Sequence, residues 1–163
     1  MQSVTERFES LCCKWTVSSK STTLRTMGLY LAIFDGDEEV DGLEVGSYDD
    51  FGVFRDTIAA AVEQGKPGSL CPVLMNHADS KGEWSVADAG NLIAELEIIE
   101  AAMRIKPPLK FNSKWKEEVA KQFGIRPANL LECFFDVDGE SLTGRLRALA
   151  ETSIARNLPI LFQ

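Results

Sequence analysis

The fold of this chain is decided by residues 27–51, which read MGLYLAIFDGDEEVDGLEVGSYDDF. The apolar run from Leu29 to Phe34 is typical of a mostly buried strand, and the Asp35-Gly36 dipeptide after it favours a turn. A weaker strand pattern follows from Gly42 to Tyr48. We therefore predict a β-hairpin whose turn is formed by the acidic residues between these two runs.

The strand pattern begins abruptly at Met27, after a Ser/Thr/Lys stretch without periodicity. We predict that residues 1–26 are an N-terminal extension, either disordered or preceding the true start codon. Residues 27–163 are long enough to build one hydrophobic core, so we expect them to form a single domain.

Downstream of the hairpin, four segments carry apolar residues at every third or fourth position, which predicts four helices. The clearest begins after Ser85, with Asp88 placed to complete a capping box, and stops before Pro107-Pro108. Apolar runs at 70–76, 131–137 and 160–162 predict three more strands. The order β-β-α-β-α-α-β-α-β predicts an α+β domain with a mixed sheet of four or five strands and about four packed helices. The apolar helix positions are Phe51, Phe54, Ile58, Val62, Ala89, Leu92, Leu96, Ile99, Met103, Trp115, Val119, Phe123, Leu142, Leu146, Leu149 and Ile154.

The chain is acidic, with a net charge of −8. Residues 27–163 alone hold 13 Lys and Arg against 23 Asp and Glu, or −10. This charge disfavours nucleic acid and anionic membranes as partners and speeds the encounter with a basic protein. No apolar run approaches the roughly 18–20 residues that span a bilayer, and the N-terminus lacks a secretory signal pattern. We expect a cytoplasmic protein.

The four cysteines show no disulfide or zinc spacing. Cys12 and Cys13 are adjacent, whereas Cys71 and Cys133 lie in apolar runs and are expected to be buried free thiols. No cofactor is expected.

Two acidic clusters could in principle bind a divalent cation. The first, residues 35–41, lacks the ligand spacing of an EF-hand loop, and it is also consistent with a solvated hairpin tip or a partner-facing patch. The second, residues 136–140, is too short for that loop and is better explained as a turn before a helix cap.

Two other functions compete. His77, with Asp79 and Cys71 nearby, could belong to a metal-dependent hydrolase, although a lone histidine cannot supply the usual histidine set. Residues 118–133 have the small–Gly–apolar pattern of a helix-turn-helix transcriptional regulator. The expected second helix lacks the basic or amide residues that read a DNA groove.

Trp84 directly precedes the Ser85 helix cap. There it could pack on Ala89 as a hydrophobic staple, or it could lie exposed as an interface anchor. The two roles can coexist.

Four segments together resemble the immunity protein 70 family of bacterial polymorphic toxin systems, and the resemblance spans residues 27–163. Where a proline often follows the helix-capping serine in that family, this chain has Val86. The resemblance implies a non-enzymatic protein that binds a cognate toxin, often a nuclease with a basic cleft, and occludes it. The segments are MGLYL through DF at 27–51, HADSKGEWS at 77–85, FFDVDGE at 134–140 and LPILFQ at 158–163.

Acidic density and one aromatic side chain mark the surface that we expect to face the toxin. The predicted contact residues are Asp37, Glu38, Glu39, Asp49, Asp50, Glu83 and Trp84.

Overall fold

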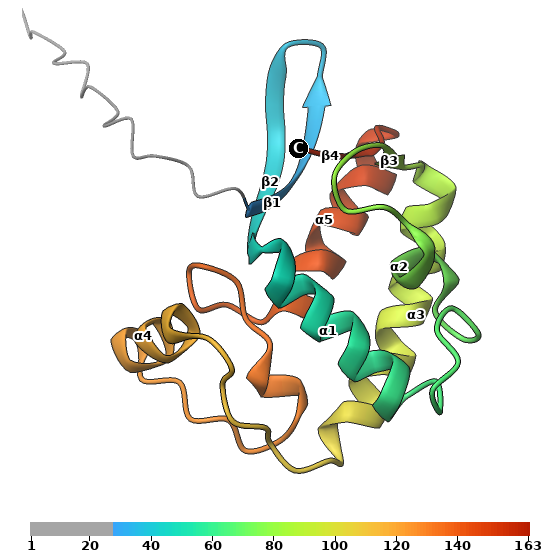
Figure 1. The fold of residues 1–163 in the computed structure, drawn as a ribbon. Coiled ribbons are helices and arrows are strands. Elements are labelled where there is room, and N and C mark those ends of the chain that lie inside the picture. Colours follow the sequence, from blue (N-terminus) through green and yellow to red (C-terminus); the bar gives the residue numbers. More distant parts are fainter. Residues whose placement is uncertain (1–27) are drawn as a thin grey trace, which may run out of the picture.

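The predicted hairpin forms the first two strands of the structure (Figure 1). The computed structural model describes residues 28–163, so the predicted extension at 1–26 lies outside the described residues. Strand β1 (Gly28–Asp35) pairs antiparallel with β2 (Glu38–Ser47), and Asp35 faces Glu38 across a turn of two residues. Gly36 adopts a φ of 62° in this turn, a conformation that glycine reaches without steric cost.

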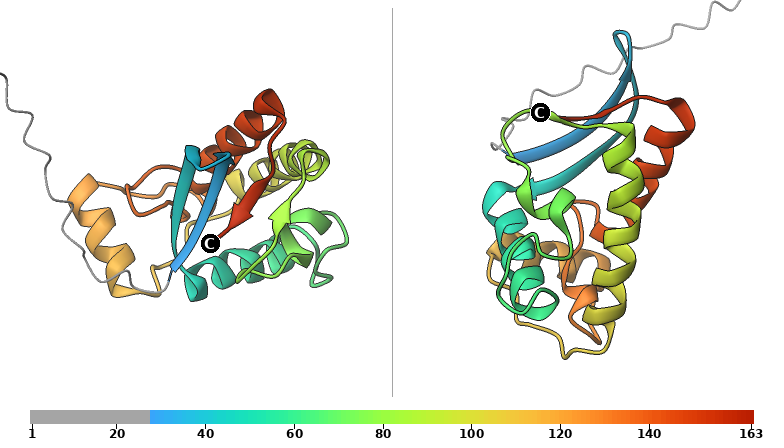
Figure 2. Two further views of the ribbon diagram at one scale, coloured as in Figure 1. Left: turned by 90° about the horizontal axis from the view of Figure 1, so that it is seen from above. Right: turned by 90° about the vertical axis from the view of Figure 1, so that its right-hand side faces the viewer.

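The α+β class is confirmed, with four strands in the order β2-β1-β4-β3. All three pairings are antiparallel, so the sheet is not mixed. Strand β4 (Ile160–Phe162) lies beside β1, and the two-residue β3 (Glu83–Trp84) forms the far edge. The long helices α3 (Val86–Arg104) and α5 (Leu142–Arg156) lie on one side of this sheet (Figure 2).

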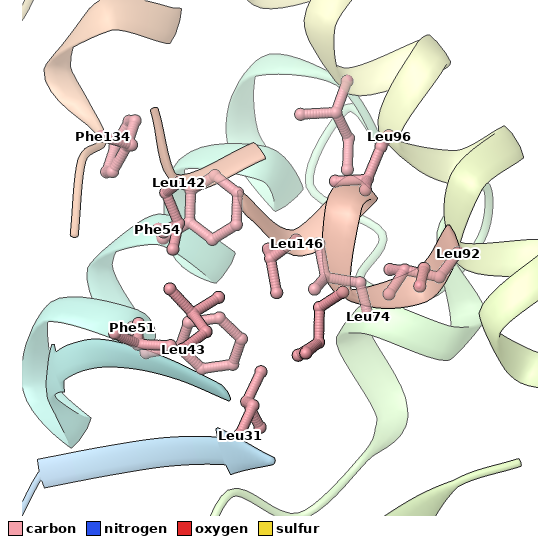
Figure 3. Close-up of a cluster of buried hydrophobic side chains, with 14 of the residues drawn as sticks. Leu31, Leu43, Phe51, Phe54, Leu74, Leu92, Leu96, Phe134, Leu142 and Leu146 are labelled. Atoms are coloured by element: carbon pink, nitrogen blue, oxygen red, sulfur yellow. The ribbon is translucent and has the colours of Figure 1, made fainter. Parts of the chain in front are cut away.

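The core forms between the hairpin and the helices. Leu29, Leu31 and Ile33 alternate along β1 and are fully buried, as expected for one face of a strand. Figure 3 shows Leu31 and Leu43 of the hairpin beside Phe51 of α1 (Tyr48–Ala61). The core also includes the predicted α3 positions Ala89, Leu92, Leu96, Ile99 and Met103, and the α5 positions Leu142, Leu146 and Leu149.

The predicted start of α3 is confirmed in detail. Asp88 donates its backbone N–H to Ser85 Oγ at 3.1 Å, and its carboxylate accepts the Ser85 N–H at 2.9 Å. This is the capping box that the sequence predicts. Two inward predictions are wrong, because Phe123 at the end of α4 (Lys114–Phe123) is 51% exposed and Ile154 near the end of α5 is 43% exposed.

The strand predicted at 70–76 is wrong, because residues Pro72–Asn76 form the short helix α2. Proline suits the first helical position, where its missing N–H would have no intrahelical partner. The Glu95 carboxylate of α3 accepts the N–H groups of Val73 and Leu74 at 2.8 and 3.0 Å. A glutamate more than 20 residues away therefore caps this helix.

The strand predicted at 131–137 is also wrong. Residues Leu131–Cys133 form the 3₁₀ helix η1, and the rest makes one isolated bridge between Phe135 and Ser141. The buried Asp136 carboxylate accepts the N–H groups of Asp138 and Glu140, which closes the turn before α5. Local side-chain acceptors compete with strand pairing here.

Helix α4 (Lys114–Phe123) ends at Gly124 with a left-handed φ of 68°, as predicted. None of the helices among residues 28–163 is both long and apolar enough to cross a membrane.

Candidate functional site

An exposed concentration of negative charge lies at the tip of the β1–β2 hairpin, which extends beyond the helices in Figure 1. Between residues 28 and 50 the chain carries eight Asp and Glu and no Lys or Arg. We call residues 28–47 the acidic hairpin. Asp35, Asp37, Glu38 and Glu39 are all exposed, so their charges face solvent from one small surface.

Side chains of the acidic hairpin also contact one another across its two strands. The Tyr30 hydroxyl donates to Glu39 Oε1 at 2.5 Å, and it lies over Gly42 on the neighbouring strand. A Cβ at position 42 would come within 2.1 Å of that hydroxyl oxygen, so only glycine permits this contact.

Helix α5 forms two hydrogen bonds to the hairpin. Thr152 donates to Asp41 Oδ2, and Arg145 donates to the Gly42 carbonyl, both at 3.0 Å. Asp41 also accepts its neighbour's backbone N–H at 2.8 Å. Asp41 therefore stabilises the hairpin, whereas the side chains of Asp37 and Glu38 make no hydrogen bond or ion pair within residues 28–163.

Two other predicted contact residues are exposed but lie away from the tip. Glu83 is at the β3 edge of the sheet, where it pairs with Leu161 of β4. Asp49 lies in the first turn of α1, at the opposite end of β2 from the turn. The structure thus groups Asp37, Glu38 and Glu39 and separates Glu83 and Asp49 from them.

Of the two alternatives for Trp84, the exposed interface anchor is excluded, since its side chain is only 1% exposed. Its ring meets Phe162 edge-on at 4.8 Å and approaches His77 at 5.9 Å. His77 stacks on the same phenylalanine at 4.1 Å. Trp84 therefore belongs to an aromatic cluster that joins β3, β4 and the loop after α2.

Asp50 is also buried, with 6% exposure, and it joins three segments. Its carboxylate accepts hydrogen bonds from Ser47 Oγ and Trp115 Nε1, and from Ser113 Oγ at 3.3 Å. The Trp115 indole lies against Gly46 at the end of β2. Asp50 thus attaches the start of α4 to the junction of β2 and α1, and it does not offer its charge to a partner.

Lys116, next to Trp115, is buried with 4% exposure. Its Nζ lies over the rings of Phe134, Phe135 and Trp115, at 4.8, 5.7 and 5.9 Å from their centroids. Burial lowers the pKa of Lys116, and the charge of Asp50 opposes that shift. No local pattern in the sequence marks this lysine as buried.

Positive charge gathers on a different part of the fold. Residues 104–126 contain seven Lys and Arg and two Glu. In Figure 1 they run from the end of α3 through α4, away from the tip of the acidic hairpin. This basic segment is therefore separate from the acidic tip.

The geometry gives little support to the two competing functions, a metal-dependent hydrolase around His77 and a helix-turn-helix regulator at residues 118–133. Arg55 is ion-paired with Asp79 and donates to the His77 carbonyl at 2.9 Å, so this loop is tied to α1. Within residues 28–163, no group of three or more His, Cys, Asp or Glu could hold a metal ion. The second helix of a helix-turn-helix is absent from residues 127–133, where only the 3₁₀ turn forms.

The buried thiols are confirmed for Cys71 and Cys133, and both are free. Burial raises the pKa of Cys71 to about 12, with the Glu95 and Glu63 charges acting in the same direction. Cys12 and Cys13 lie outside the described residues.

Comparison with known proteins identifies the class. The model of the family described as Immunity protein 70 matches residues 29–162. The chain therefore belongs to this family, which indicates an immunity protein of a toxin system. Comparisons with curated proteins and with solved structures gave no match.

Proposed function

We propose that this protein neutralises a cognate polymorphic toxin in the bacterial cytoplasm by binding the toxin domain and blocking its active surface. The contact surface would be the tip of the acidic hairpin, with Asp37, Glu38 and Glu39 at its centre. The observation that carries the proposal is the protruding tip of exposed carboxylates, in a stretch of chain from 28 to 50 that contains no Lys or Arg.

The charge distribution supports a basic partner. Unpaired carboxylates on a projecting element attract positive charge over about one Debye length, roughly 8–10 Å at physiological salt. Such steering raises the association rate more than it raises the intrinsic affinity. The basic residues at 104–126 would face away from the toxin, which would favour one orientation of approach.

The proposed toxin contacts are narrower than the seven residues expected from the sequence. Glu83 and Asp49 would lie at the margin of the interface, because they are exposed but distant from the tip. Trp84 and Asp50 would act only indirectly, by holding β3 and α4 in place, since both side chains are buried.

The test is co-expression of the full chain with the toxin gene next to its locus, scored by host survival and co-purification. We expect rescue by the wild type and failure by the variant with Asp37→Lys, Glu38→Lys and Glu39→Lys. The control carries Asp56→Lys, Glu117→Lys and Glu118→Lys, which changes the net charge equally at other exposed positions. Equal rescue by both variants would refute the proposed surface, and no rescue by the folded wild type would refute the proposed function.

A further inference from the structure

A cavity of about 340 Å³ lies beside Lys116. Its size falls within the range of small-molecule pockets. Its walls are mainly apolar and come from three distant parts of the chain. The lining residues are Val53, Leu109, Phe111, Lys116, Cys133 and Phe134, with Lys110 and Asn112 completing it.

Lys116 is the unusual member of this lining. Only 4% of its surface is exposed, its side chain makes no hydrogen bond or ion pair to any residue of 28–163, and three aromatic rings lie close to its ammonium group. Cation–π contacts replace part of the lost hydration, at about 0.5–2 kcal/mol each. The rings offer the three N–H donors no carbonyl or carboxylate acceptor, so these donors are left to solvent or to a ligand in the cavity.

The charged residues around the cavity favour a ligand with a negative charge. No carboxylate lines it. Asp50, whose charge acts on Lys116, already accepts hydrogen bonds from Ser47, Ser113 and Trp115. Lys110 adds a second, exposed ammonium group to the lining. An anionic group is therefore the complement that the cavity lacks.

The Cys133 thiol in the lining does not supply the missing negative charge. Cys133 Sγ accepts the Leu109 N–H at 3.3 Å, and burial raises the pKa of its thiol. A neutral, hydrogen-bonded thiol contributes an apolar wall.

We propose that this cavity binds a small aromatic carboxylate, with the carboxylate on Lys116 and the ring against Phe111 and Phe134. The proposal is independent of toxin binding, because the cavity shares no residue with the acidic hairpin. A bound ligand would also stabilise the attachment of α4, since Lys116 lies in that helix.

The probe is 1-naphthylacetate, with the uncharged 1-naphthylacetamide as its matched control, titrated into the full chain by calorimetry and by thermal shift. We expect the acid to bind at least 10-fold more tightly than the amide. We also expect backbone amide NMR shifts at Phe111, Lys116 and Cys133. This test uses the wild-type protein alone. Absence of binding by the acid at millimolar concentration, or equal binding of acid and amide, would overturn the proposal.

The variant Lys116→Met keeps the length of the side chain and removes the charge. It should lose at least 10-fold in affinity for the acid, whereas Lys114→Met, at an exposed position in the same helix, should bind as the wild type does. Unchanged affinity of Lys116→Met would show that apolar contact alone holds the probe, which contradicts the proposed role of the lysine.

Discussion

Substitution of Asp50 should release α4 from the rest of the fold. In Asp50→Ala, Trp115 Nε1 and Ser113 Oγ lose the acceptor that ties them to α1, and the Ser47 hydroxyl loses its partner too. The two serine hydroxyls can rotate towards water, whereas the indole N–H is fixed in a ring that packs on Gly46, so the indole bond carries most of the cost. A hydrogen bond to a charged group contributes about 1.5–3 kcal/mol, which places the total loss at about 3 kcal/mol.

The loss should be local before it is global. A change of about 3 kcal/mol corresponds to about 100-fold in the opening equilibrium. We expect hydrogen exchange of the α4 amides to accelerate by that factor, while the amides of α3 keep their protection at low denaturant. Asp50→Asn keeps one acceptor oxygen and should show about half of the free-energy change.

Asp49→Ala is the matched control, because it removes an exposed acid from the same helical turn. It should leave α4 exchange unchanged. The reasoning is refuted if Asp50→Ala leaves α4 protected, or if α3 and α4 lose protection to the same extent. The pKa of Lys116 should also fall further in Asp50→Ala, because the opposing charge is removed.

Three further predictions concern buried groups. Trp84→Ala should lower the free energy of unfolding by about 3–5 kcal/mol in urea titrations, whereas exposed Glu83→Ala should change it by less than about 0.5 kcal/mol. Burial raises the pKa values of Glu95 and Asp136 in the folded state, so the stability that they contribute is present below their unfolded pKa and is lost as the pH rises through the folded value. Urea titrations between pH 4 and 7 should show this loss, and it should be smaller in Glu95→Gln; an identical pH profile would contradict the assignment. With a pKa of about 12, Cys71 should react with iodoacetamide about 1,000-fold more slowly than a free thiol at pH 8, and peptide mapping with and without urea would reveal fast labelling of the folded protein if this is wrong.

The candidate site could be predicted from sequence only in part. The density of acids at 35–39 was visible because a turn forces neighbouring side chains together at one exposed tip. Exposure of Trp84 and Asp50 could not be read from the sequence, because it depends on Phe162 and Trp115, which are 78 and 65 residues away. The burial of Lys116 could not be predicted for the same reason, since its ring neighbours Phe134 and Phe135 are 18 and 19 residues away in the sequence.

The sequence by itself determined the elements whose signals are local. These are the hairpin with its glycine turn, the capping box and apolar stripe of α3, the glycine stop of α4 and the acidic surplus. Only the tertiary structure decided residues 70–76 and 131–137. A short apolar run satisfies a strand or a buried helix equally well, and the choice at 70–76 depended on the distant carboxylate of Glu95, which accepts the exposed N–H groups of a helix start.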